Sequence, residues 1–298
     1  MAFKKSSIPM ATVRVGDMTF YWRNGRMVGR VRHNAGKGPQ VSPRQITVCS
    51  RWSNLVNFWR AFGPQCKPHF ECIGKGPTNY NAFVSHGMHA EPVYLTRWQS
   101  RNGACVVNSV RVSEGTLRSI AVSDDGTAYA TDIALGRLTV DDGTTVGQLA
   151  AAIVRNNDDF CFNDALWFYV AFQRENPATG LPEAEVQCVR LALDPGDGQP
   201  LWQGTAERLG FVSRGGVLAA ASRVEGGMAW VHLRKGRSGL KRSTQHLVCD
   251  NPLLARMGSE EALAEACRSY GCDGEEPFLT PNDNPRPPRT ETNYGETI

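Results

Sequence analysis

The sequence predicts an α+β protein: an N-terminal basic β-hairpin with helices packed on its apolar face, followed by a β-sandwich-like body. Three observations lead to this prediction. An Asn-Gly pair at 24–25 separates two runs of alternating character, helical spacing marks residues 42–88, and short β-runs with turn signals follow from about residue 103. With 298 residues, of which 41% are apolar, the chain is long enough to bury a core.

The hairpin is the clearest local signal. In the segment DMTFYWRNGRMVGRVR (17–32), Asn-Gly favours a two-residue type I′ turn, and this turn fixes which residues face each other. One face is then apolar and the other is polar and basic, so the register is well specified. The apolar pairs are Trp22 with Met27, Phe20 with Gly29 and Met18 with Val31; the other face pairs Tyr21 with Val28, Thr19 with Arg30 and Asp17 with Arg32.

A helix is expected after the hairpin. Ser42 suits the N-cap, Pro43 the first helical position, and Gln45 completes a capping box. Gly63-Pro64 should end the helix, and a second short helix is expected over 79–88. At helical spacing, the buried stripe is predicted to be Val48, Cys49, Trp52, Leu55, Val56, Trp59 and Phe62, with Asn54, Asn57 and Arg60 on the outer face.

The body is expected to be built of short strands. They are predicted at 105–112, 117–122, 129–133, 166–172, 186–193, 217–222, 228–234 and 243–249. One helix should interrupt them at 146–155, with Thr145 and Gln148 as capping box, and another should follow at 260–270, with Ser259 as N-cap and Gly271 as its stop.

Composition divides the chain into four parts. We expect a hairpin-plus-helix domain at 1–100, a β-sandwich-like domain at 101–250, a C-terminal helix at 251–272 and an extended Pro-rich tail at 273–298. The tail has five prolines and few apolar residues, so it cannot bury enough surface to offset its ordering entropy. We therefore expect it to become ordered only against another chain.

The charge is unevenly distributed. Residues 1–100 hold fourteen Lys/Arg against three Asp/Glu, whereas the remainder holds nineteen against twenty-six. A basic first third implies an anionic partner: nucleic acid, an acidic protein surface or the chain's own second part. The residues predicted to contact that partner are Arg23, Arg26, Arg30 and Arg32. Phe20 and Trp22 point to the opposite face, which is unlike the stacking platforms of single-strand binders.

A group of cysteines and histidines raises the question of a metal site. Cys66, His69 and Cys72 lie three residues apart, and His86 and His89 follow. Zinc requires four converging ligands, and Cys-x2-His-x2-Cys is not a standard spacing for them. We therefore predict no metal and no cofactor, with these five residues as the candidates to be checked.

No catalytic template is found. The sequence contains no Gly-x-Ser-x-Gly elbow, no His-Glu-x-x-His and no phosphate-binding loop ending in Gly-Lys-Ser/Thr. We predict that the protein is not an enzyme; a metal-dependent or otherwise unrecognised hydrolase is the competing interpretation.

Its location is also predicted from composition. The first residues contain no apolar signal-peptide core, no stretch is long enough to span a membrane, and nine scattered cysteines are typical of reduced thiols. We expect synthesis in the cytoplasm and no membrane partner.

The order of several motifs resembles a known family. The chain resembles an uncharacterised family, catalogued as a domain of unknown function and abundant in gut Bacteroidetes genomes and their prophages. The resemblance is carried by a helix start at Pro43, Arg44 and Gln45, by YNAFVSH at 80–86, by RVSEGTL at 111–117 and by TVGQLAAAIVRNNDDF at 145–160. The resemblance covers about residues 14–250. Members usually lack the cysteines and paired histidines found here, and the family supplies no catalytic residues.

The resemblance implies a structural or surface-assembly role. We therefore expect a non-enzymatic assembly protein, a component of a phage-like particle or another repeating assembly, whose partners are copies of itself or other assembly proteins and whose location includes the virion. The alternative is a nucleic-acid-binding protein that uses the basic hairpin.

Overall fold

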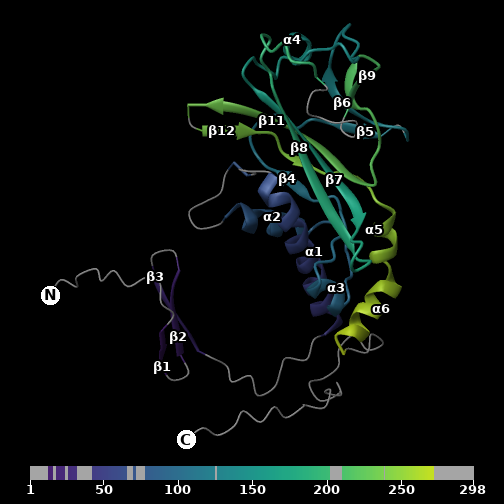
Figure 1. Cartoon of the computed structure of the whole chain (residues 1–298). Helices are drawn as coiled ribbons and strands as arrows, with labels where there is room; N and C mark the ends of the chain where they lie inside the picture. Colours follow the sequence, from purple (N-terminus) through teal and green to yellow (C-terminus); the bar gives the residue numbers. More distant parts are fainter. Residues whose placement is uncertain are drawn as a thin grey trace, which may run out of the picture. The chain divides into compact units, whose positions relative to one another are not determined.

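The computed structural model describes residues 13–15, 18–23, 26–31, 42–65, 70–71, 78–124, 126–201, 210–237 and 239–271. The chain divides into two compact units, Met1–Gln40 and Val41–Ile298, and each is described by itself (Figure 1). The predicted turn at 24–25 and the predicted tail at 273–298 lie outside the described residues.

The first unit is a three-stranded antiparallel sheet. Its strands β1 (Val13–Val15), β2 (Met18–Arg23) and β3 (Arg26–Val31) pair in the order β1-β2-β3. The predicted register of the hairpin is confirmed for the six pairs from Met18↔Val31 to Arg23↔Arg26. The strand β1, which the sequence analysis did not predict, pairs with β2 through Val13↔Phe20 and Val15↔Met18.

A long antiparallel sheet lies at the centre of the second unit. Its strands run in the order β12-β11-β7-β8, and β14 pairs with β11. Both faces of β7 and β11 are buried, because runs such as LWFYVAF and MAWVHL are apolar at nearly every position. The bounds are β7 (Ala165–Glu175), β8 (Pro182–Ala192), β11 (Gly226–Gly236), β12 (Gly239–Arg242) and β14 (Val248–Asp250).

Helices cover one face of this sheet. The helices α1 (Pro43–Gln65) and α2 (Asn79–Gly87) place Phe58, Phe62 and Phe83 in one apolar core with Tyr169 of β7 and Val231 of β11. Figure 1 shows both helices on the same side of the long strands. The rings of Phe58 and Phe83 stack with their centroids 6.0 Å apart, so the two helices are joined by aromatic contact.

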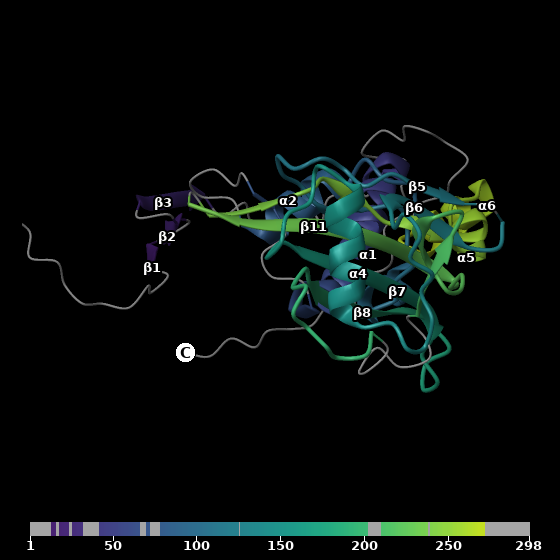
Figure 2. The ribbon, with the colours of Figure 1, turned by 90° about the horizontal axis from the view of Figure 1, so that it is seen from above.

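A second sheet and a helix cover the opposite face. Leu166, Phe168 and Trp230 point into a core shared with α4 (Val146–Asn156). Figure 2, seen from above, shows α4 lying across β7 and β8. The second sheet has the order β5-β6-β10-β9, with bounds β5 (Val122–Asp124), β6 (Tyr129–Ala134), β9 (Phe211–Arg214) and β10 (Val217–Ala220). The mixed α+β class, with antiparallel sheets packed on one another, is thus confirmed.

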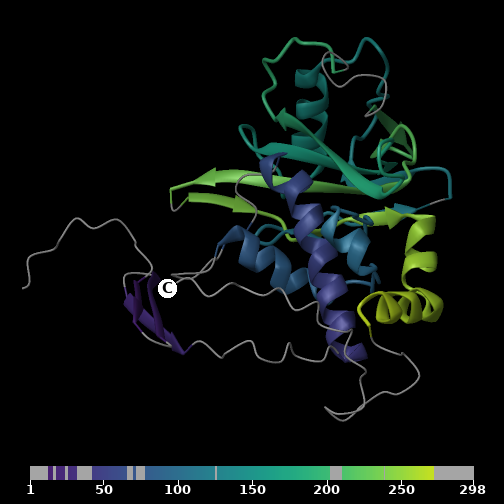
Figure 3. The same ribbon diagram turned by 60° about the horizontal axis from the view of Figure 1, so that its bottom comes forward.

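The remaining elements lie around the helical side. A two-stranded sheet joins β4 (Arg111–Ser113) to β13 (Gln245–His246). The helices α3 (Arg97–Arg101), α5 (Pro252–Met257) and α6 (Glu260–Ser269) complete the unit. Ala266 and Cys267 of α6 are buried with Ile46 of α1, and Figure 3 shows α6 near the start of α1.

The N-terminal caps of three helices were predicted correctly, whereas α1 continues through the predicted stop at Gly63-Pro64 to Gln65. Ser42 and Gln45 exchange the two capping-box hydrogen bonds at the start of α1, and Thr145 and Gln148 do so at α4. The Oγ of Ser259 accepts from the Ala262 amide at the start of α6. These signals are local, so they can be recognised in the sequence without knowledge of the fold.

The predicted buried face of α1 is confirmed at Leu55 and Phe62, each 1% exposed, but it is wrong in the first half of the helix. Val48 and Trp52 are 54% and 50% exposed, whereas Asn54 and Asn57 are buried. The Nδ2 of Asn54 donates to the Val106 carbonyl and its Oδ1 accepts from the Val106 amide, at 2.9 and 2.7 Å. Asn57 donates likewise to the Ala104 carbonyl at 2.9 Å. Polar side chains are buried here because they complete the hydrogen bonding of a neighbouring segment that forms no ladder.

The strand predicted at 105–112 is largely absent, because side chains rather than a neighbouring strand form hydrogen bonds with the backbone of this segment. Within the described part of the chain, strand pairing in this segment begins only at Arg111. The Val107 amide donates to the Oε1 of Gln173 at 2.9 Å, and the Val107 carbonyl accepts from Asn251 at 2.8 Å. Side chains thus take the place of a neighbouring strand.

The predicted boundary at residue 100 does not separate two cores. Leu55 and Phe62 of α1 are buried together with Ala229 and Val231 of β11, and the compact units meet at Gln40–Val41. The apolar side of a helix can be buried against any adjacent apolar face, and a sequence pattern does not specify which face that will be.

Candidate functional site

The basic face of the N-terminal sheet is the first candidate. Arg14 pairs with Thr19, Thr19 with Arg30, and Arg23 with Arg26. Because side chains alternate along strands and paired residues share a face, all four arginines belong to one face. Of the predicted contact residues, Arg23, Arg26 and Arg30 are thus placed together, and Arg32 lies outside the described residues.

The opposite face of this sheet is apolar at every described position. By the same alternation it holds Val13, Val15, Met18, Phe20, Trp22, Met27, Gly29 and Val31. A Cβ on Gly29 would lie 2.9 Å from the Phe20 ring, so the glycine makes room for the aromatic side chain. Met18 and Met27 are 38% and 63% exposed. Exposed apolar side chains such as these two methionines are typical of a contact surface.

The second candidate is a polar cluster on the helical side of the second unit. The Nε2 of His86 lies 2.7 Å from the Oε2 of Glu114, and its Nδ1 lies 3.3 Å from Nη1 of Arg111. The Nε of Arg111 donates to the Nε2 of His246 at 3.3 Å. Because a guanidinium only donates, the contacting nitrogens of both histidines accept, and His86 donates to Glu114 through Nε2. Burial, with Arg111 and His86 nearby, lowers the pKa of His246 below its usual value.

This cluster bears on the predicted metal candidates. His86 is engaged by Glu114 and Arg111, and Phe70 stacks on its ring with centroids 5.8 Å apart. His89 is exposed in the turn after α2. Among the described residues, no group of three or more His, Cys, Asp and Glu is arranged to hold a metal ion. Cys66, His69 and Cys72 lie outside those residues.

A third cluster is buried beside the central sheet and was not predicted. The Oδ1 and Oδ2 of Asp164 accept from Nε and Nη2 of Arg234 at 2.9 and 2.8 Å. Its Oδ2 also accepts from the Cys161 amide and from Nε2 of His232, each at 2.8 Å. Phe160 stacks on the His232 ring with centroids 4.2 Å apart. The sequence signal is slight: His232 and Arg234 are two apart on an otherwise apolar strand.

The electrostatics of this cluster indicate a structural role. Burial alone would raise the pKa of the Asp164 carboxyl, but the hydrogen bonds from Arg234, the Cys161 amide and His232 outweigh it and lower that pKa. Burial lowers the pKa of His232 against the opposing effect of Asp164, so the imidazole is neutral at pH 7. The carboxylate is paired with a cation, and His232 and Asp164 are 1% and 3% exposed. The cluster therefore joins β7 to β11 rather than facing a ligand.

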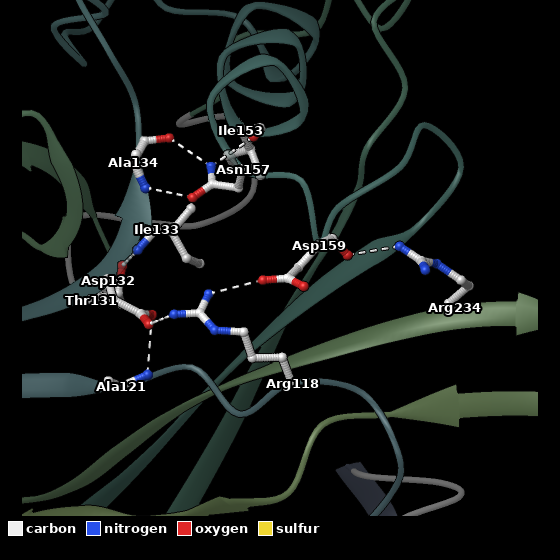
Figure 4. Close-up of polar contacts among 10 residues, drawn as sticks. All are labelled: Arg118, Ala121, Thr131, Asp132, Ile133, Ala134, Ile153, Asn157, Asp159 and Arg234. Atoms are coloured by element: carbon white, nitrogen blue, oxygen red, sulfur yellow. Dashed lines mark hydrogen bonds and ion pairs between the residues drawn. The ribbon is translucent and has the colours of Figure 1, made fainter.

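Further ion pairs connect this region to the second sheet. Arg118 pairs with Asp132 and, at 3.2 Å, with Asp159, whose carbonyl accepts from Arg234 at 2.7 Å. Asn157 bonds both the amide and the carbonyl of Ala134 (Figure 4). These contacts hold the loop after α4 against β6 and against the end of β11.

The described thiols are poor nucleophiles where they are buried. Burial raises the pKa of Cys105, and it raises that of Cys249 to about 12. A thiol with a raised pKa stays protonated at pH 7 and is unreactive.

Comparison of the chain with models of known protein families, with curated protein sequences and with solved structures finds no match. The predicted resemblance to a family of Bacteroidetes and their prophages therefore stays a prediction. No described helix combines the length and the apolar character needed to cross a membrane.

Proposed function

We propose that the protein is a non-enzymatic assembly protein, and that the apolar face of its N-terminal sheet binds a neighbouring copy or another assembly protein. The observation behind the proposal is the separation of this sheet as a compact unit with one apolar and one basic face. A component of a phage-like particle is the version that the motif resemblance favours.

Energetic considerations support the proposal. Three strands are the minimum for a sheet that is stable on its own, and such a sheet gains stability by covering its hydrophobic face. Burying one methionine side chain contributes about 1.5–3 kcal/mol, and Met18 and Met27 both keep exposed surface. Covering the face with another chain would thus stabilise the sheet and the assembly together.

Charge favours a head-to-tail contact. Residues 1–40 hold eight Lys/Arg and one Asp, a net charge of +7, whereas residues 41–298 hold twenty-five Lys/Arg and twenty-eight Asp/Glu, a net charge of −3. Two N-terminal sheets repel each other, whereas a sheet and the second unit of a neighbour attract. Such a heterologous contact repeats from copy to copy and builds rings or filaments.

The second unit serves as the scaffold in this proposal. We infer that it is a β-sandwich-like body, since the four-stranded and five-stranded sheets share one apolar core. A rigid scaffold with the hairpin as a separate unit is suited to repeated contacts between copies.

The double substitution Met18→Asp/Met27→Asp tests the proposal. Two carboxylates on the apolar face should weaken self-association at least tenfold, because tenfold corresponds to only about 1.4 kcal/mol. Sedimentation velocity over a concentration series measures the change. The matched control is Thr19→Asp/Val28→Asp, which adds the same charge to the opposite face. Equal association of the parent and the Met18→Asp/Met27→Asp chain would contradict the proposal.

Nucleic-acid binding is the second candidate, because four arginines share the other face of the sheet. It predicts salt-dependent binding to random duplex DNA, and Arg14→Gln/Arg30→Gln should lower the salt slope by about two, since each lost phosphate contact lowers it by about 0.9. Binding unchanged by salt and by these substitutions would exclude this candidate.

A further inference from the structure

One long edge of the central sheet is open. The strand β8 pairs with β7 over all 11 of its residues without a shift of register, and it is the last strand on its side of the sheet. The strand at the other edge, β12, has 4 residues. An edge strand presents a row of backbone amides and carbonyls to which another strand can pair. The edge of β8 is therefore a place where a second chain can extend the sheet.

The hydrogen bonds at the two ends of β8 show which of its backbone groups point outward. The Asn176 amide donates to the Leu181 carbonyl at 2.8 Å, and the Leu193 amide donates to the Asp164 carbonyl at 2.8 Å. Because the bonding alternates along an antiparallel ladder, the odd-numbered residues of β8 bond β7. The even-numbered residues direct their amides and carbonyls away from β7; after Pro182 they are Ala184, Val186, Cys188, Arg190 and Ala192.

This outer row has no backbone partner in the described part of the chain. The Pro182 carbonyl accepts from the Cys105 amide at 2.7 Å, which closes the row at its first residue. From Ala184 to Ala192 no described backbone group bonds the outer side of β8. Backbone groups need a hydrogen-bonding partner wherever water is excluded, so a neighbouring strand would find every position of this row free to pair.

The charged side chains of β8 do not guard the edge. Charged side chains that project from an edge strand usually keep other strands away. Here Glu185 accepts from Arg174 of β7 at 3.2 Å, and Glu183 accepts from an asparagine of the β7–β8 hairpin at 2.9 Å. The guanidinium of Arg190 lies over the Trp167 ring, 4.8 Å from its centroid. All three side chains are thus held on their own sheet, and they leave the edge accessible.

We propose that β8 pairs antiparallel with β8 of a second copy, around a two-fold axis at Cys188. Side chains alternate along a strand, so an axis normal to the sheet places even-numbered residues opposite even-numbered ones. Ala184 then lies opposite Ala192 of the second copy, and Val186 lies opposite Arg190 of the second copy. All five outward residues are paired in this register, and no charged side chain lies directly opposite another.

The ends of the strand fit this register. β8 ends at Ala192, which lies opposite Ala184 of the second copy. The second chain therefore leaves the edge before it reaches Pro182, whose carbonyl is already bonded to Cys105.

The pairing rests on the proposed assembly function, because one pair of strands is weak alone. Five outward residues in each copy form about ten backbone hydrogen bonds of about 1 kcal/mol each, and association costs about 4–15 kcal/mol. Isolated copies therefore do not associate through β8. Rings or filaments built head to tail present one β8 edge per copy, so two of them join through many such pairs at once.

Proline at position 188 tests the pairing. The Cys188 amide points outward, so Cys188→Pro removes the donors at the two-fold axis and leaves the ladder to β7 intact. The matched control is Cys188→Ala, which keeps the amide. Where the parent assembles, we expect Cys188→Pro to halve the mass of the assembly, or its mass per unit length, and Cys188→Ala to leave it unchanged. Light scattering and electron microscopy measure both quantities.

Ala184→Pro is the second variant, because it removes outward amides at the ends of the paired region instead of its centre. Urea denaturation identifies which of the two proline variants fold like the parent. A folded proline variant whose assemblies equal those of Cys188→Ala would overturn the pairing and leave the contact of the N-terminal sheet standing. A parent chain that does not assemble would overturn both. Met18→Asp/Met27→Asp should abolish assembly altogether, whereas Cys188→Pro should leave single rings or filaments.

Discussion

Replacing Phe58 with alanine is expected to lower the free energy of unfolding by about 3–5 kcal/mol, whereas replacing Trp52 should change it by about 1 kcal/mol or less. Phe58 is 1% exposed and stacks on Phe62 and Phe83, with centroids 5.7 and 6.0 Å apart. Trp52, on the same helix, is 50% exposed.

Urea denaturation of the two variants measures this difference directly. Tryptophan is larger than phenylalanine, so Trp52→Ala would be the more destabilising substitution if side-chain size decided the outcome. The comparison therefore separates the effect of burial from the effect of size. A larger loss of stability for Trp52→Ala than for Phe58→Ala would show that α1 packs through the face predicted from its apolar stripe, not through the face found in the structure.

Changing Asp164 to asparagine is expected to cost about 3 kcal/mol, the lower end for breaking a buried ion pair, because it leaves the buried His232 and the one-third exposed Arg234 guanidinium without their carboxylate. Asp159→Asn is the matched control: this side chain is 48% exposed and pairs with Arg118, and exposed pairs contribute about 0–1 kcal/mol. Both variants are compared with the parent by urea denaturation at pH 7.

The pH dependence gives this prediction a second measurement. The pKa of Asp164 is lower in the folded protein than in the unfolded chain, where it is near 3.9. The ionised carboxylate therefore contributes to folding stability above the pKa of the unfolded chain, and this contribution is lost as the pH falls through the pKa of the folded protein. The difference between parent and Asp164→Asn should therefore shrink as the pH falls below about 4. A difference that stays constant would mean that Asp164 is not held as a carboxylate by Arg234.

Local features of the fold could be predicted from the sequence, since they depend on neighbours in the chain. The hairpin register follows from the turn and the alternation of apolar residues, and the caps at Ser42, Thr145 and Ser259 follow from a few residues each. The burial of Asn54 on α1 could not be predicted, because it depends on Val106, fifty-two residues away. A polar residue that bonds a distant backbone looks in the sequence like any exposed one.

The polar clusters were missed for a related reason. Asp164 and Arg234 are seventy residues apart and meet because β7 and β11 pair. Arg111 and His246 meet because β4 pairs with β13. Of the candidates taken from the sequence, His86 does join a cluster, but its described neighbours there are Glu114 and Arg111 rather than cysteines.

The assembly role rests on a contact between copies through the apolar face of the N-terminal sheet, and sedimentation equilibrium of the purified full-length chain tests it most directly. We expect the average mass to rise with concentration above the 32.7 kDa of one chain, and the rise to be abolished by Met18→Asp/Met27→Asp but kept by Thr19→Asp/Val28→Asp. A mass of one chain at every concentration, for the parent and both variants alike, would contradict the account.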